Sequence, residues 1–72
     1  MDQLTAMRVF TMIAKNRSFK AAAAEIGVAP SVVSKHLLYL EKHLGTQLVK
    51  RTTRSVDVTE LGDLYLEKCR SI

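Results

Sequence analysis

The side chains best suited to chemistry in this sequence are the hydroxyl and amino groups that follow Pro30. Ser31, Lys35 and Leu38 fall on one face of a predicted helix, and Ser34 falls on its flank. Hydroxyl and ammonium groups in such a row donate hydrogen bonds to nucleic-acid base edges and to phosphate oxygens. The sequence shows no nucleophile paired with a base, no carboxylates placed for one cleft and no phosphate-binding glycine loop, so we expect no enzyme.

The supply of metal ligands is too small for a metal site. Cys69 is the only cysteine in the sequence, and His36 and His43 are its only histidines. One thiol forms no internal disulfide, and these three residues do not have the spacing of a zinc cluster. We therefore expect neither a metal nor a cofactor in this chain.

Positive charge is concentrated in the middle of the sequence, and the formal net charge is +4. Between residues 15 and 54, eight basic side chains stand against two acidic ones. Between residues 55 and 72, two basic side chains stand against four acidic ones. A localised basic face is typical of a nucleic-acid-binding protein, although charge at this level also occurs on ordinary solvated surfaces.

A predicted helix-turn-helix over residues 18–44 positions the polar row. Apolar side chains recur at helical spacing in two segments: Phe19, Ala22, Ala23 and Ile26, then Val33, Leu37, Leu40 and Leu44. Only Gly27-Val28-Ala29 is left for the turn, with Gly27 expected at positive φ and Pro30 at the first position of the next helix. That helix, over residues 30–43 or 30–44 and ended by Gly45, is the candidate recognition helix. Ala29 is a poor N-cap for it.

After Gly45 the apolar period changes to two, which predicts two short strands over residues 47–51 and 55–58. The hairpin has a polar, basic tip at Thr52-Thr53-Arg54. A hairpin beside a recognition helix is a wing, here residues 48–58. Arg51 and Arg54, placed at its tip, are expected to meet phosphate or a minor groove, unless the hairpin is only a solvated loop.

Two further helices flank these elements. Asp2 is expected to cap a first helix that reaches Asn16, whose wide apolar arc should pack against both the helix-turn-helix and the last helix. Thr59 is expected to cap the last helix, with Leu66 outside its apolar stripe. We expect that stripe to form a homodimer contact: Leu61, Leu64, Tyr65, Cys69 and Ile72.

A chain of 72 residues has room for one domain, and it holds no apolar run of the roughly 18 residues that a membrane span requires. Met1-Asp2-Gln3 has no basic segment typical of a signal peptide. We therefore expect a cytoplasmic protein without a membrane partner. The last helix is still apolar where the sequence stops. We therefore expect either that this chain is part of something longer or that the helix completes itself against a partner.

The sequence closely resembles the N-terminal DNA-binding domain of LysR-type transcriptional regulators, from Leu4 to the final helix. The most specific matching segments are Ser18-Phe19 with Ala22-Ala23, Val33-Ser34, Leu40-Glu41 with Leu44-Gly45, Leu48-Val49-Lys50-Arg51, and Thr59-Glu60-Leu61-Gly62. The resemblance implies a mainly α winged helix-turn-helix over residues 1–58, with a three-helix core and a two-stranded wing. It also implies that residues 59–72 begin a linker helix that forms a homodimer.

The resemblance further implies binding to an interrupted inverted repeat in double-stranded promoter DNA, in a regulator associated with the bacterial nucleoid. A downstream domain that senses a small-molecule effector is absent from this chain. Base and nearby phosphate contacts are implied for Pro30, Ser31, Ser34 and Lys35. Phosphate contacts are implied for Ser18 and Lys20, wing contacts for Arg51, Thr53 and Arg54, and a close approach to the first helix for Gly62.

Three positions depart from the family pattern. Ala29 stands where a serine cap is common, and Lys35 stands where arginine is common. Lysine is a point charge, so it contacts guanine less bidentately than arginine does. At the third position, Leu38 places an apolar group on a face that is more often basic in the family. Leu38 is a candidate DNA contact that could pack on a thymine methyl group, or it could remain a harmless exposed leucine. The alternative function is a winged-helix module in which the wing, Leu38 and Tyr39 bind a protein rather than DNA.

Overall fold

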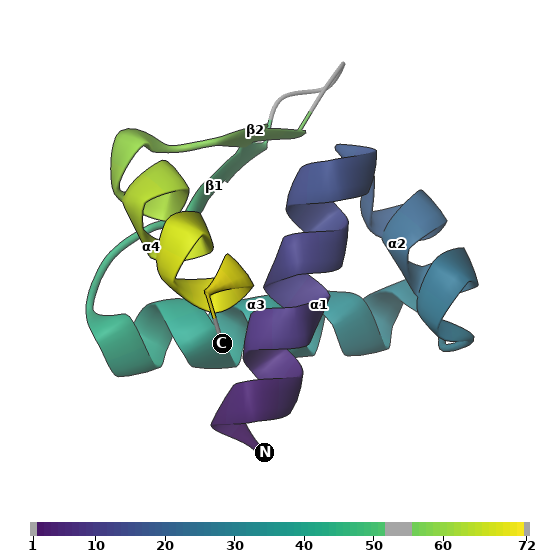
Figure 1. The fold of residues 1–72 in the computed structure, drawn as a ribbon. Coiled ribbons are helices and arrows are strands. Elements are labelled where there is room, and N and C mark those ends of the chain that lie inside the picture. The colour runs from purple at the N-terminus through teal and green to yellow at the C-terminus, as the bar shows by residue number, and fades with distance from the viewer. Residues whose placement is uncertain (1, 52–55, 72) are drawn as a thin grey trace.

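The computed structural model describes residues 2–51 and 56–71, and Figure 1 shows their arrangement. Within these residues the elements follow the order α1 (Gln3–Asn16), α2 (Phe19–Ile26), α3 (Pro30–Leu44), β1 (Val49–Arg51), β2 (Val56–Val58) and α4 (Glu60–Arg70). The two strands are antiparallel and pair Val49 with Val58, Lys50 with Asp57 and Arg51 with Val56. The predicted mainly α winged helix-turn-helix is confirmed.

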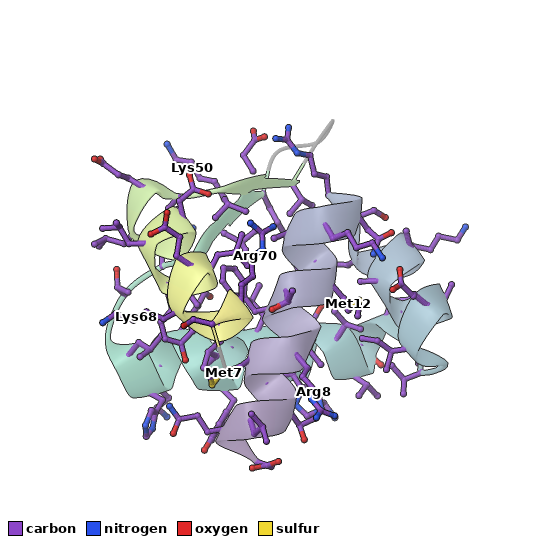
Figure 2. The ribbon with its side chains drawn as sticks, in the orientation of Figure 1. Met7, Arg8, Met12, Lys50, Lys68 and Arg70 are labelled. Carbon is purple, nitrogen blue, oxygen red and sulfur yellow. The ribbon has the colours of Figure 1, made fainter. Side chains whose placement is uncertain are left out.

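Helix α1 lies at the centre and packs against α2, α3 and α4 (Figure 1). Its buried side chains are Ala6, Val9, Phe10 and Ile13. Met7 and Met12, labelled along α1 in Figure 2, are half-buried and pack against this core. An apolar arc this wide exceeds the single face that one neighbour can cover. The expectation that the first helix touches both the helix-turn-helix and the last helix is confirmed.

The predicted starts of α1 and α2 are confirmed by their N-cap hydrogen bonds. The Asp2 carboxylate accepts hydrogen bonds from the backbone N–H groups of Leu4 and Thr5, at the start of α1. Ser18 Oγ accepts from the N–H of Ala21 at 3.1 Å, at the start of α2. These side-chain acceptors satisfy N–H groups that have no partner inside the helix.

An ion pair ties the end of α1 to α2. Lys15 Nζ lies 3.3 Å from Glu25 Oε2, and Asn16 Nδ2 donates to Glu25 Oε1 at 3.2 Å. Hydrogen bonds from Asn16 and Lys15 hold the pKa of Glu25 below its ordinary value. A lowered pKa in the folded state stabilises the fold above the ordinary pKa, and this contribution is lost as the pH falls through the lowered value.

The tight turn between α2 and α3 depends on Gly27. Its φ is +89°, and its N–H donates to the carbonyl of Ala23 at 2.8 Å, which closes α2. Pro30 occupies the first position of α3, and Ala29 before it makes no side-chain cap, as predicted. Val33, Leu37 and Leu40 are buried. Three residues of the predicted stripes are not fully buried: Phe19 and Leu44 are half-buried, and Ile26, next to the turn, is 39% exposed.

Strand β1 is shorter than predicted, because the backbone groups of Gln47 and Leu48 form hydrogen bonds outside the ladder. The Thr59 hydroxyl donates to the Gln47 carbonyl at 2.7 Å, and the Thr59 N–H donates to the Leu48 carbonyl at 2.9 Å. The N–H of Leu48 donates to the Glu41 carboxylate at 2.7 Å. These residues therefore join the wing to α3 and α4, and the ladder begins at Val49. The predicted tip at 52–54 lies outside the described residues.

Thr59 caps α4 as predicted, since its Oγ1 accepts from the N–H of Gly62 at 2.9 Å. The expectation that Leu66 lies outside the apolar stripe is wrong, because Leu66 is buried in the core. The approach of Gly62 to the first helix, implied by the resemblance, stays a prediction, and the tightest contact at Gly62 is with the wing. The nearest neighbours of a Cβ at Gly62 are the Leu48 carbonyl and a Val58 methyl group, both in or beside the wing. Within the described residues, no helix has the length and apolar character needed to cross a membrane.

We predict that Gly62→Ala destabilises the chain by about 1–3 kcal/mol, the usual cost of overpacking. The added methyl group would collide with the rigid Leu48 carbonyl, so α4 must move away from the wing. Helix propensity alone predicts the opposite sign, a gain of about 1 kcal/mol. Urea unfolding measures the change, with exposed Glu67→Ala in the same helix as the control. A stabilised Gly62→Ala variant would contradict the close approach.

Candidate nucleic-acid interface

The outward face of α3 carries the predicted contact residues at its start. Pro30, Ser31, Lys35 and Leu38 are exposed, and Ser34 is half-buried on the flank beside the wing. The buried residues Val33, Leu37 and Leu40 point the opposite way, so they fix the rotation of the helix about its axis. The polar row is therefore presented to solvent on a rigid element.

The N-terminal end of α3 has a second property. Among the described residues, no side chain caps its first turn, since the Ala29 side chain has no acceptor. Pro30 has no N–H, and the N–H of Val32 donates to the Ala29 carbonyl at 3.0 Å, which leaves that of Ser31. Such groups carry partial positive charge, and they suit an anionic oxygen such as that of a phosphate. Lys35 lies in the second turn, so both features favour negative charge at the same end of the helix.

Ser18 and Lys20 lie at the start of α2. Lys20 is exposed and Ser18 is half-buried. The Ser18 oxygen is engaged as the cap of α2, but its hydroxyl proton remains available for donation. Ser18 can therefore cap the helix and donate to a phosphate oxygen at the same time.

Arg51 ends β1, as the predicted strand did, and directly precedes the predicted tip of the hairpin. Its side chain turns back onto the helices. Its Nη2 donates to Ser34 Oγ at 2.9 Å, and its guanidinium carbon lies 3.8 Å from the centroid of the Phe19 ring. The structure thus joins two residues that the sequence assigned to separate contacts. Thr53 and Arg54, the other predicted wing residues, lie outside the described residues.

A hollow of about 200 Å³ lies between α3 and the wing. Its lining includes Ser34 and Arg51, together with Leu37, Leu38, Glu41, Gln47 and Val49. Leu38 is 64% exposed at its edge. The hollow is open to solvent and mainly apolar, and its polar lining residues are Ser34, Glu41, Gln47 and Arg51.

Glu41 was missed as a site residue, although it holds the wing beside α3. Its Oε2 accepts from the N–H groups of Leu48 at 2.7 Å and Val49 at 3.2 Å. The available signal was the carboxylate itself, which lies in the last turn of a helix. Negative charge is unfavourable next to a helix C-terminus, so a carboxylate there indicates a partner elsewhere in the fold.

The residues predicted for dimerisation separate into two groups. Leu61 and Leu64 are 55% and 59% exposed and line a hollow that also includes Leu44, Leu48 and Lys68. Tyr65 and Cys69 are half-buried against the core, with the Tyr65 ring 6.1 Å from that of Phe10. Burial raises the pKa of the Tyr65 hydroxyl and of the Cys69 thiol, so both groups are neutral near pH 7. Ile72 lies outside the described residues.

Metal chemistry has no visible basis in the part of the chain that the structure describes. No three histidine, cysteine, aspartate or glutamate side chains gather there in a way that could hold an ion. The interface instead offers hydroxyl, ammonium and guanidinium groups. These groups bind anions and hydrogen-bond acceptors through direct contact.

We predict that Glu41→Ala destabilises the chain by about 1–3 kcal/mol, because two backbone N–H groups lose a charged acceptor. Hydrogen exchange should locate the effect, since the amides of Leu48 and Val49 are expected to exchange faster while those of α1 change least. Glu41→Gln keeps one acceptor oxygen and should fall between Glu41→Ala and the wild type. Unchanged protection at both amides in Glu41→Ala would contradict the anchoring role.

Comparisons with known proteins place the chain in a family. An HTH-type transcriptional repressor of Pseudomonas aeruginosa is 43% identical over 70 residues, which cover 97% of this chain and 22% of the repressor. The HTH-type transcriptional regulator DmlR of Escherichia coli is 42% identical over 69 residues, covering 96% of this chain and 22% of that protein. The chain therefore spans about a fifth of the length of these relatives.

Solved structures agree with the sequence relatives. The DNA-binding domain of CbnR, in complex with DNA, superposes with a TM-score of 0.93 at 27% identity, covering 99% of this chain and 80% of that one. The DNA-binding domain of BenM, in complex with benA site 1 DNA, has a TM-score of 0.91 at 30% identity, with coverage of 99% and 79%. A family described as bacterial regulatory helix-turn-helix protein, lysR family, matches residues 4–63. This chain belongs to that family.

Proposed function

We propose that this chain binds double-stranded DNA sequence-specifically as the DNA-binding part of a transcription regulator. Helix α3 enters the major groove, and the wing lies on the backbone or in the minor groove. One observation carries this proposal: the exposed hydroxyl and ammonium groups in the first two turns of α3 stand beside a wing that Glu41 anchors to the same helix. A recognition helix uses its N-terminal turns in this way.

The groups of α3 have distinct tasks in this proposal. Lys35 donates to guanine N7 or O6, or to a nearby phosphate, and Ser31 and Ser34 donate to base edges. Pro30 contacts the DNA at the start of the helix, and it has no backbone N–H to donate. Leu38, at 64% exposure, contacts a thymine methyl group or a sugar.

Contacts to the phosphate backbone fix the orientation of α3 in the groove. Ser18 and Lys20 supply them from the start of α2, and the first turn of α3 adds the backbone N–H of Ser31. Thr53 and Arg54 of the wing are assigned here from the sequence. Arginine suits this place because its forked donors match phosphate oxygens.

A homodimer on an inverted repeat completes the proposal. Leu61 and Leu64 on α4 are the candidate contact residues, because both are largely exposed apolar side chains on one side of the helix. Tyr65 and Cys69 contribute to the dimer contact only with the parts of their side chains that remain exposed. Ile72 is included from the sequence. The full-length regulator carries a domain for a small-molecule effector and acts in the bacterial cytoplasm at the nucleoid.

The proposal is tested by selecting bound duplexes from a random pool and then titrating salt. We expect an enriched sequence with two inverted half-sites, because a dimer presents two recognition helices. The affinity for the selected duplex should fall linearly in log salt, with a slope of about −0.9 for each phosphate contacted. No enrichment and no salt slope would contradict DNA binding and favour the protein-interaction module, with Leu38 and Tyr39 as its exposed and half-exposed contacts.

We predict that Lys35→Ala reduces discrimination between the selected duplex and random duplex by about 1–3 kcal/mol, the value of a specific base contact. Fluorescence anisotropy with both duplexes measures the ratio. Lys42→Ala is the matched control, since Lys42 is exposed on the same helix but lies in its last turn. A ratio unchanged by Lys35→Ala would remove Lys35 from the base-contacting residues.

A further inference from the structure

Arg51 is held between the wing and both helices of the helix-turn-helix. Its guanidinium donates to Ser34 Oγ at 2.9 Å and lies over the Phe19 ring at 3.8 Å. One side chain therefore connects β1, α2 and α3. Lysine cannot reproduce this contact, because it has neither the planar face nor the forked donors of arginine.

The hydrogen bond determines what the Ser34 hydroxyl can do. A guanidinium has donors only, so Ser34 Oγ must be the acceptor in this pair. The hydroxyl proton is then directed away from Arg51 and is free to donate. Ser34 is half-buried at the hollow between α3 and the wing, and so its free side is the outward side of α3.

We propose that Arg51 is a positioning residue that holds the Ser34 hydroxyl as a hydrogen-bond donor toward the major groove. This inference rests on the proposed function of α3. Guanine, adenine and thymine present acceptors in the major groove, whereas cytosine presents its N4 amino donor. Ser34 held in this way disfavours cytosine at one position of each half-site. Arg51 thereby contributes to sequence preference through Ser34.

If Arg51 bound a phosphate instead, its substitution would have different effects on DNA binding. A phosphate contact depends on charge. Its loss therefore weakens binding to all DNA sequences alike and lowers the salt slope. In this structure, one edge of the guanidinium is engaged by Ser34 and one face is covered by Phe19. Two uncharged groups therefore set its position. Replacing Arg51 by lysine keeps the charge, but a lysine ammonium cannot stack on Phe19 with a planar face and donate to Ser34 from its edge at the same time. The substitution therefore separates the two roles.

The experiment compares Arg51→Lys, Arg51→Ala and Ser34→Ala with the wild-type chain. Its probes are the duplex that the wild-type chain selects from a random pool, single-base variants of that duplex, and random duplex of the same length. Lys50→Ala is the matched control, because Lys50 is the neighbouring exposed cation of β1 (Figure 2) and its side chain leaves the opposite side of the strand. Affinity and salt slope are measured for each protein variant with each duplex.

Ser34→Ala identifies the position that Ser34 contacts, since discrimination against cytosine there should fall about fivefold, the value of one ordinary hydrogen bond. Arg51→Lys is expected to lose the same discrimination while its salt slope stays that of the wild type. The double variant Ser34→Ala/Arg51→Lys should lose no more than either single variant, because both act on one contact. Lys50→Ala should keep the discrimination.

Two results would overturn the positioning role. One is an Arg51→Lys variant that keeps the discrimination at the Ser34-dependent position. The other is an Arg51→Ala variant that weakens all duplexes alike, keeps the discrimination and reduces the salt slope by about one. A wild-type chain that selects no duplex would instead overturn the proposed function, so the two failures are distinguishable.

Discussion

Burial of the wide apolar arc of α1 is the constraint on which the other elements depend. Ala6, Phe10 and Ile13 are fully enclosed, and α1 contacts α2, α3, α4 and β2 to achieve this. Burial of a side chain such as Phe10 or Ile13 contributes about 1.5–3 kcal/mol, which is a large share of the stability of so small a domain. Because α1 needs several neighbours, it fixes where the turn, the wing and α4 must lie around it.

The short segment between α3 and β1 holds the wing against the packed helices, and so it shapes the candidate binding site. Glu41 holds the N–H groups of Leu48 and Val49, while Thr59 holds the carbonyls of Gln47 and Leu48. Gly62 permits α4 to lie directly against the Leu48 carbonyl. The recognition helix, the wing and the candidate dimer helix therefore share one anchoring point. A shift in α4 would therefore be transmitted to the wing.

Local rules predicted most of the fold. The caps Asp2, Ser18 and Thr59 and the positive φ of Gly27 depend on neighbours within four residues, so they could be derived from the sequence. The outward polar face of α3 followed from its apolar period in the same way. The apolar stripe on α4 was less accurate, because Leu66 was left outside it and its half-buried members were given only to a partner surface. Leu66 is instead buried, and Tyr65 and Cys69 pack on the core.

The sequence by itself determined the helices, the turn, the basic middle segment and the candidate contact row after Pro30, because period, capping and charge are local properties. Only the tertiary structure decided that Arg51 reaches Ser34, 17 residues away, and stacks on Phe19. It also decided that Glu41 anchors the wing and that Gly62 lies against the Leu48 carbonyl. These contacts join separate elements, and their geometry depends on how the shared core orients those elements, which no local pattern records.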